Sequence, residues 1–252
     1  MRPVRALLAL SVLTVPLSGC SDGPPPKQGD PAPTRSVAPQ EPRAQLAGLV
    51  AAALDRRYVT SYTYTPKGGP ARKIDVTLGV DGTWKIDIPN GALGNTANIS
   101  VVGTKDGTFQ CGVALVTAPA TPGPATCVKL ASPVPAKYDI RIQHLFTDWL
   151  PPLTSRSAAL SVAAAKFEAP GSCFSVESTS ASIAAPVDPG TYCFQADGVL
   201  TGARIGAGTL VQTGAVASPP VSVALPGPVS GGPPLQLAAL PPAPSPTPTK
   251  KP

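Results

Sequence analysis

The feature that most constrains the fold is a two-residue alternation of apolar and polar side chains, which recurs between short turn signals. Successive residues of a β-strand point to opposite faces of a sheet, so this period is typical of strands with one buried face. The alternation is sharpest around Asp81-Gly82, a dipeptide typical of hairpin turns. The apolar positions there are Ile74, Val76, Leu78 and Val80 before the turn, and Trp84, Ile86 and Ile88 after it.

Similar runs along the chain predict about ten short strands. The first run places three tyrosines, Tyr58, Tyr62 and Tyr64, on one face, where they serve either as core or as a platform for a sugar or lipid. Later runs place a strand at 138–142, through Ile140, and an edge strand at 221–225. Helical patterns do not alternate with these runs, so we expect a mainly β protein with an antiparallel sheet.

Two segments break the strand pattern and predict helices. Between Pro42 and Arg57, apolar residues recur at helical spacing, and Pro42 suits the first helical turn. A short central helix is expected around Leu145–Leu150, with Pro151-Pro152 ending it. The N-terminal helix should cover part of the apolar face of the sheet, because its stripe consists of Leu46, Leu49, Val50, Ala53 and Leu54.

The N-terminus has the pattern of an export signal. Arg2 and Arg5 precede a short apolar run, Ala6–Val15, whereas a membrane-spanning helix needs about 20 residues. The run leads to Leu17-Ser18-Gly19-Cys20, which resembles the bacterial lipobox. The lipobox implies a diacylglyceryl group on the Cys20 thiol, acyl chains such as palmitate, and cleavage before Cys20. The alternative is an ordinary secretory signal peptide with a chance cysteine.

Proline-rich tracts bound the foldable part of the chain. Such tracts bury little apolar surface and favour extended chain. We therefore expect a signal peptide at 1–19, a lipidated cysteine and tether at 20–42, a β-rich domain at 43–228 and a disordered tail at 229–252. Loss of Arg2 and Arg5 with the signal peptide lowers the formal charge from +6 to +4. The basic residues are scattered rather than clustered, so no nucleic-acid partner is expected.

Four cysteines follow Cys20, and an even number in an exported chain implies disulfides. Three pairings are possible. We expect the local one, Cys111–Cys127 and Cys173–Cys193, because each closes a loop between two strand-like runs. Zinc is not expected, because neither CxxC nor CxxH spacing occurs.

Catalytic patterns are mostly missing from the sequence. The single histidine, His144, lies near Asp148, but no GxSxG motif accompanies it. His144 is interpreted as a polar residue at a helix start or as a partner of Asp148. No enzymatic activity and no cofactor is expected.

Part of the second half resembles the LolA/LppX-like lipoproteins, above all their actinobacterial members. The resemblance is carried by Gly171–Val176, Gly190–Phe194 and Asp197-Gly198-Val199-Leu200, together with the order of lipobox, tether, helix and meander. It covers about 45–225 and implies a curved half-barrel with a hairpin stapled by a cysteine pair. It also implies a concave apolar face, covered by helices, that holds acyl chains.

The first functional hypothesis is a membrane-anchored lipoprotein that binds lipid or another apolar ligand on this concave face. The alternative is an extracytoplasmic interaction or sensor domain with a filled core. We expect a monomer on the extracytoplasmic face of the cell membrane, held by its lipid anchor. The candidate ligand-binding residues are Tyr62, Val76, Leu78, Trp84, Ile86 and Ile140.

Overall fold

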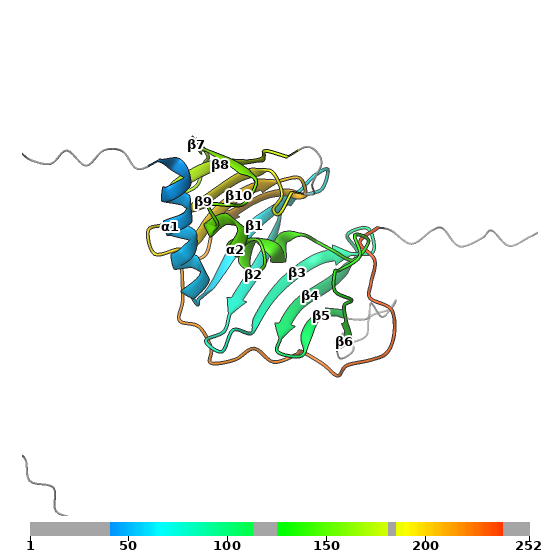
Figure 1. Ribbon diagram of the computed structural model, residues 1–252. Helices are drawn as coiled ribbons and strands as arrows, with labels where there is room; N and C mark the ends of the chain where they lie inside the picture. The colour runs from blue at the N-terminus through cyan, green and yellow to red at the C-terminus, as the bar shows by residue number, and fades with distance from the viewer. Residues whose placement is uncertain (1–40, 113–124, 181–184, 239–252) are drawn as a thin grey trace, which may run out of the picture. The chain divides into compact units, whose positions relative to one another are not determined.

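The structure, a computed structural model, describes residues 41–112, 125–180 and 185–238, which belong to one compact unit. Within these residues the main element is an open, curved, antiparallel sheet of eleven strands (Figure 1), and this confirms the predicted fold class. The strands are β1 (Val59–Pro66), β2 (Arg72–Leu78), β3 (Trp84–Ala92), β4 (Ala97–Thr104), β5 (Gly107–Gly112), β6 (Thr126–Lys129), β7 (Leu160–Ala165), β8 (Ser172–Ser178), β9 (Gly190–Phe194), β10 (Leu200–Ile205) and β11 (Gly208–Gln212).

Each half of the sheet is a meander, and the two halves meet where β1 pairs with β11. The spatial order is β6-β5-β4-β3-β2-β1-β11-β10-β9-β8-β7. The first and last strands therefore lie at the centre of the sheet, where Tyr64 is opposite Leu210. Strands β6 and β7 form its two edges.

One face of the sheet carries the main core, and we call it the inner face. Tyr62 lies opposite Ile74 across β1 and β2, and Val76 lies opposite Ile86 across β2 and β3. Cross-strand partners share a face, so these four side chains point to the same side. All four are fully buried in one apolar cluster. The alternating residues within the strands therefore share one buried side, and of the two alternatives for the tyrosines the structure shows the core. The expected place of Val80 on that face is wrong, because β2 ends at Leu78 and Val80 is 59% exposed in the turn.

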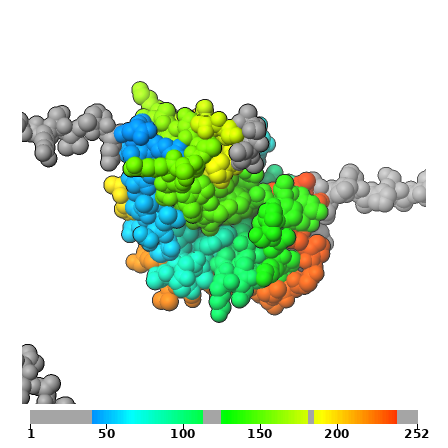
Figure 2. All heavy atoms as spheres, in the orientation of Figure 1, coloured from blue at the N-terminus to red at the C-terminus, as the bar shows by residue number. Residues whose placement is uncertain are grey.

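Three short elements cover the inner face: α1 (Pro42–Asp55), the 3-10 helix η1 (Ile142–Phe146) and α2 (Leu150–Thr154). Helix α1 begins at the predicted proline and buries Leu46, Val50 and Ala53. It packs against α2. In Figure 2, blue α1 and the green segment that carries η1 and α2 lie side by side.

The C-terminal end of α1 rests on the turn between β9 and β10. Gly198 has a φ of 85°, and a Cβ there would lie 2.3 Å from the backbone nitrogen of Ala53. Only glycine combines this backbone conformation with so close an approach. Arg56, the residue after the helix, forms an ion pair of 3.1 Å with Asp197. The predicted Asp-Gly turn therefore supports the helix as well as reversing the chain.

The central segment differs from its prediction. Residues 138–142 form no strand, because Arg141 has a φ of 63° and its N–H donates to Asp139 Oδ1 (3.0 Å). Left-handed backbone at Arg141 breaks an extended run. Pro151-Pro152 also do not end a helix, since they lie in the first turn of α2. Proline is well suited to that turn because its missing N–H has no partner there in any helix.

The chain after β11 forms a strap, residues 213–238, that passes from the outer face to the inner face of the sheet. Val223 and Leu225 pack on an outer-face cluster that includes Phe109. The orange-to-red segment in Figure 1 then continues along β6. Leu235 and Leu237 pack against the inner-face core. The predicted edge strand at 221–225 is wrong, because this part of the strap bonds only to the β2–β3 turn.

The prediction of a disordered tail from residue 229 is wrong for residues 229–238. Val229 forms a parallel bridge with Cys127, and the Ser230 N–H donates to the Cys127 carbonyl (2.8 Å). Gln110 exchanges two hydrogen bonds with the backbone of Leu235. Two features of this segment hold it against the sheet. Apolar residues between its prolines pack on the core, and its backbone pairs with the edge of β6, which proline content alone does not indicate. Residues 239–252 lie outside the described part.

Candidate functional site

The predicted ligand-binding residues all lie at the inner face, but at different depths. Tyr62, Val76 and Ile86 are fully buried in the core. Leu78 and Trp84 line a cavity at one end of the cover formed by α1, η1 and α2. Ile140 lines a second cavity at the other end. The structure therefore places three candidates in packed core and three at openings.

The first cavity has a volume of about 240 Å³ and lies between the end of α1, the β2–β3 turn and η1. Its apolar lining is Leu54, Leu78, Trp84, Phe146 and Leu150, and its polar lining is Arg57, Thr83 and Thr147. Ligand pockets are usually about 300–1,000 Å³. As it stands, the cavity has room for part of an acyl chain.

The second cavity has a volume of about 210 Å³ and lies beyond η1, near the β1–β2 and β3–β4 turns. Ile88, Ile140 and Leu237 give it an apolar wall. Arg72 and Arg141 also line it. It therefore differs from the first cavity in having two guanidinium groups beside an apolar surface.

Packed side chains separate the two cavities. The ring of Phe146, from η1, meets the ring of Tyr62 edge-on at 5.4 Å. Tyr62 donates to the Leu200 carbonyl (2.8 Å), and its hydroxyl is 3.1 Å from that of Tyr58. Burial raises the pKa of Tyr58 to about 12. The hydroxyls of Tyr58 and Tyr62 and the carbonyl of Leu200 thus form a chain of neutral hydrogen bonds in the middle of the apolar core.

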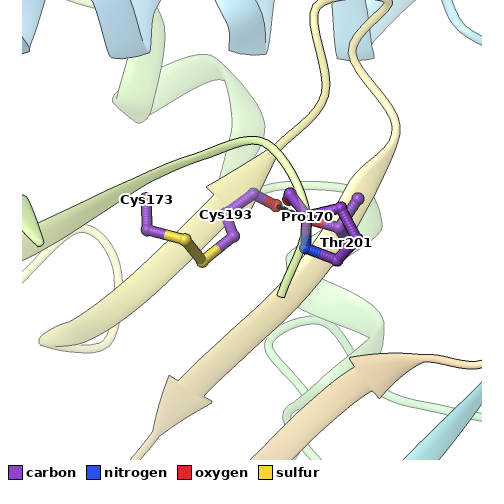
Figure 3. The surroundings of a disulfide bond; sticks show 4 residues. All are labelled: Pro170, Cys173, Cys193 and Thr201. Atoms are coloured by element: carbon purple, nitrogen blue, oxygen red, sulfur yellow. Dashed lines mark hydrogen bonds between the residues drawn. A yellow bond between two sulfur atoms is a disulfide. The ribbon is translucent and has the colours of Figure 1, made fainter. Parts of the chain in front are cut away.

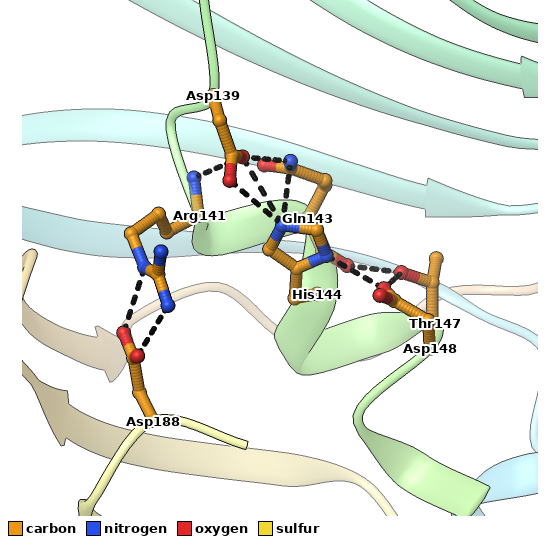
Figure 4. A network of polar contacts seen from close by, with 7 residues as sticks. All are labelled: Asp139, Arg141, Gln143, His144, Thr147, Asp148 and Asp188. Atoms are coloured by element: carbon orange, nitrogen blue, oxygen red, sulfur yellow. Dashed lines mark hydrogen bonds and ion pairs between the residues drawn. The ribbon is translucent and has the colours of Figure 1, made fainter. Parts of the chain in front are cut away.

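A polar cluster fixes the conformation of the cover (Figure 4). His144 Nδ1 is 2.6 Å from Asp148 Oδ1, and His144 Nε2 is 3.1 Å from both oxygens of Asp139. Gln143 donates to Asp139 Oδ1 at 2.5 Å. The imidazole stacks on Trp149 with ring centroids 5.1 Å apart. The predicted contact between His144 and Asp148 is confirmed, and Asp139 is a second partner.

This arrangement makes His144 a cation. Burial alone lowers its pKa, but hydrogen bonds to Asp139 and Asp148 outweigh burial and raise the pKa to about 9. Burial raises the pKa of each carboxyl, but the hydrogen bonds from His144, together with those from the Arg141 backbone and Gln143 to Asp139 and from Thr147 to Asp148, outweigh it and leave both pKa values lowered. A histidine whose two nitrogens both donate to carboxylates has no lone pair for a substrate proton. The cluster is therefore suited to holding the cover in place rather than to proton transfer by His144.

Arg141 ties the cover to the loop before β9. Its guanidinium forms a two-pronged ion pair with Asp188, with Nε 2.9 Å from Oδ2. Such forked pairs are among the stronger charged hydrogen bonds. The ion pair joins residues 47 positions apart, so it connects the cover to the second half of the sheet.

A third cavity, of about 690 Å³, lies under the strap on the outer face. Phe109, Val223 and Leu225 line it together with the charged turn residues Lys105 and Asp106. It faces away from the inner face and contains none of the predicted ligand-binding residues. It is therefore separate from the candidate site.

Both predicted disulfides are present. Cys111–Cys127 joins β5 to β6, and Cys173–Cys193 joins β8 to β9, with the paired residues directly opposite in each case. Figure 3 shows the second disulfide beside Thr201, whose hydroxyl donates to the carbonyls of Pro170 and Cys193. The pairs staple neighbouring strands in opposite halves of the sheet.

Cys20, the predicted lipidation site, lies outside the described residues. Among the described residues, no helix has the length and apolarity needed to cross a membrane, and no group of three or more potential ligands is placed to hold a metal ion. Neither a protein-family model nor a curated protein matches this chain.

Sequence reasoning missed the polar part of the site. Arg72 is one charged residue in an alternating strand, and Asp139, Arg141 and Gln143 alternate with apolar residues as the solvent side of a strand does. A local signal exists only for His144 and Asp148, whose spacing of four residues places them on one face of a helical turn. Nothing local signals the contact between Arg141 and Asp188.

Proposed function

We propose that this protein is a lipid-anchored extracytoplasmic lipoprotein of the LolA/LppX-like kind, and that it binds an acyl chain or another apolar ligand on the inner face of its sheet. One observation carries the proposal. The curved apolar face is covered by short separate elements rather than by a second sheet, and a cavity lies at each end of that cover.

The inner face supplies the binding energy in this proposal. Each methylene removed from water gains about 0.8 kcal/mol, and the first cavity presents mainly aliphatic and aromatic side chains. A full acyl chain exceeds 240 Å³, so η1 has to move away from Tyr62 as the chain enters. η1 is a short element joined to the sheet by side-chain packing and by the Arg141–Asp188 pair. The His144 cluster lies wholly within residues 139–148, so it moves together with η1 once the Arg141–Asp188 pair and the contact of Phe146 with Tyr62 are broken.

The sequence supports the proposed location. A short apolar run followed by Leu17-Ser18-Gly19-Cys20 has the pattern of a lipoprotein signal. One acyl chain holds a protein weakly, whereas two or more hold it stably. The proline-rich tract that ends before α1 then acts as a spacer between the anchor and a monomeric domain, and the membrane is both support and source of ligand.

The direct test is mass spectrometry of lipids that co-purify with the protein from its own membrane. Leu78→Trp should fill the first cavity without adding charge and reduce the co-purified lipid several-fold. Thr77→Trp is the matched control, because the neighbouring residue in β2 points to the other face of the sheet. Circular dichroism and thermal melting establish that both variants are folded.

Unchanged lipid content in a folded Leu78→Trp variant would remove this cavity from the proposal. No bound lipid in the wild-type protein would favour the second candidate function, an interaction or sensor domain with a filled core. The full burial of Tyr62, Val76 and Ile86 favours that candidate. The two functions differ in whether η1 separates from the sheet, which hydrogen exchange with and without added lipid measures.

A further inference from the structure

The second cavity contains a guanidinium that forms no ion pair with any carboxylate of the described residues. Arg72 donates through Nη1 to the carbonyls of Asn90 and Pro89, and through Nη2 to Asn95 Oδ1 (2.8 Å). These acceptors belong to the end of β3 and to the β3–β4 turn, which together hold the side chain in place. They are neutral, so the charge of Arg72 remains available to a ligand.

Two of the five N–H groups of Arg72 are also without an acceptor among the described residues, Nε and the second hydrogen of Nη2. Nε is buried beneath the guanidinium and out of reach of a ligand. The remaining hydrogen of Nη2 can donate to an anionic oxygen in the cavity, and that oxygen pairs with the charge, since arginine donors suit carboxylate and phosphate oxygens.

The other charged groups of the cavity do not cancel this charge. Arg141 faces the same cavity while it pairs with Asp188. Asp139 is the opposing charge, but its oxygens already accept bonds from Gln143, from His144 and from the Arg141 backbone. Its negative charge is thus directed toward the protonated imidazole, and Arg141 is neutralised by Asp188, so Arg72 is the lining charge that has no ion-pair partner among the described residues.

The apolar wall begins directly beside these charges. Ile88 and Ile140 line the cavity and belong to the inner-face core, and Leu237 closes it from the strap. A ligand that fits both parts has an anionic group next to an aliphatic chain. The volume of about 210 Å³ suits the anionic group and the first part of the chain.

We propose that the cavity at Arg72 is the subsite for the anionic group of an amphiphilic ligand, a carboxylate or a phosphate, whose aliphatic chain extends under η1 along the inner face. This inference rests on the proposed function and names the class of its ligand. Arg72 binds the anion directly, and Arg141, paired with Asp188, lines the same cavity.

The test uses the whole purified protein kept soluble with amphipol, and four ligands with the same ten-carbon chain. Decanoate and decyl phosphate carry the two anionic groups, decanol is neutral, and decyltrimethylammonium is cationic. Binding is measured by calorimetry at pH 7.5. We expect one or both anions to bind at least tenfold more tightly than decanol, and the cation most weakly, since charged hydrogen bonds are worth more than neutral ones.

The arginine variant separates the subsite from general attraction of anions. Arg72→Gln should lower the affinity of the preferred anion to about that of decanol and leave decanol unchanged. Arg72→Lys keeps the charge and should keep part of the preference. Lys67→Gln is the matched control, since it removes the same charge from an exposed residue near the same end of the sheet that does not line the cavity.

The outcomes are distinct. Equal affinity of wild-type protein for decanoate, decyl phosphate and decanol overturns the anion subsite and leaves apolar binding standing. A preference for anions that survives Arg72→Gln, or that Lys67→Gln abolishes equally, also overturns it. Failure of all four ligands to bind overturns the proposed function and the subsite with it. If Arg72→Gln is unfolded, the ligand series on the wild-type protein and on Arg72→Lys still decides the question.

Discussion

Arg43, in the first turn of α1, donates its guanidinium to the carbonyl of Leu160, the first residue of the edge strand β7. The same guanidinium bonds to the carbonyls of Ser155 (2.6 Å) and Ala158 (2.9 Å). One side chain thus joins the N-terminal end of the covering helix to the segment between α2 and β7. Three carbonyls share this single cation, and that of Ala158 also accepts from the backbone N–H of Leu160 (2.7 Å).

Arg43→Ala should therefore lower the free energy of unfolding by about 1.5–3 kcal/mol, because hydrogen bonds to a charged group are lost and the carbonyls lose their donor. Urea unfolding followed by fluorescence measures the change. Arg156→Ala, at an exposed residue of the same region, is the control and should change stability by less than about 0.5 kcal/mol. Equal stability of the two variants would contradict the anchoring role.

The cluster around His144 should make stability depend on pH. The folded pKa of His144, about 9, lies above the unfolded value of about 6.5. The stabilisation that protonated His144 adds to the free energy of unfolding is therefore fully present below pH 6.5 and is lost as the pH rises through 9. The aspartates have lowered pKa values, so their contribution is present above about pH 4 and is lost as the pH falls. Cluster stabilisation is thus greatest between about pH 4 and 6.5.

Unfolding midpoints in urea at pH 6, 7.5 and 9.5 measure the alkaline part of this dependence. We expect a loss of about 1–2 kcal/mol across the range, after allowing for solvent screening of the partly exposed Asp148. The His144→Gln variant should be less stable than the wild-type protein at pH 6. Its free energy of unfolding should change little between pH 6 and 9.5, since the chain has a single histidine. An equally steep slope in the variant would assign the dependence to other groups.

The disulfides give a covalent test of the two-hairpin layout. Peptide mapping without reduction should find Cys111–Cys127 and Cys173–Cys193, whose sequence separations are 16 and 20. Loops of this size are worth about 3 kcal/mol each in the chain-entropy model. Replacing either pair by alanine should therefore lower stability by a similar amount. A link from Cys111 to Cys193 would be incompatible with the strand order.

The anchor is tested at the cysteine itself. Mature wild-type protein should begin at Cys20 and carry a diacylglyceryl group by intact-mass spectrometry, and it should partition into detergent. Cys20→Ser should stay uncleaved by the lipoprotein peptidase, because no thioether can form. If that variant reaches its mature mass and still partitions into detergent, the lipobox interpretation is wrong.

The strap should protect the edge strand β6. A protein that ends at Pro228 loses the bridge between Val229 and Cys127 and the bonds of Gln110 to Leu235. Exposed strand edges pair with other chains, so we expect a lower melting temperature and self-association in light scattering. A protein that ends at Ala238 keeps these contacts and should behave like the full chain. Monodisperse behaviour of both would show that β6 needs no cover.

The strands and the helix α1 were predictable from sequence because local spacing determines them. Val76 and Ile86 alternate in runs whose burial follows the two-residue period, and the Asp81-Gly82 turn fixes their register. Residues 138–142 also alternate, but a positive φ at Arg141 and its distant partner Asp188 override that pattern. The subsite at Arg72 depends on turns and on the strap, which lie far apart in sequence, so no local pattern indicates it.

The pairing of β1 with β11 has a consequence for how the protein folds. Each half of the sheet consists of hairpins between neighbours, which close over short stretches of chain. Tyr62 and Gln212, in contrast, meet across nearly the whole domain. Contacts of such sequence separation slow folding because a long loop has to close first. Because each disulfide lies within one half, oxidation can precede the pairing of β1 with β11, which forms only after the last strand has left the ribosome.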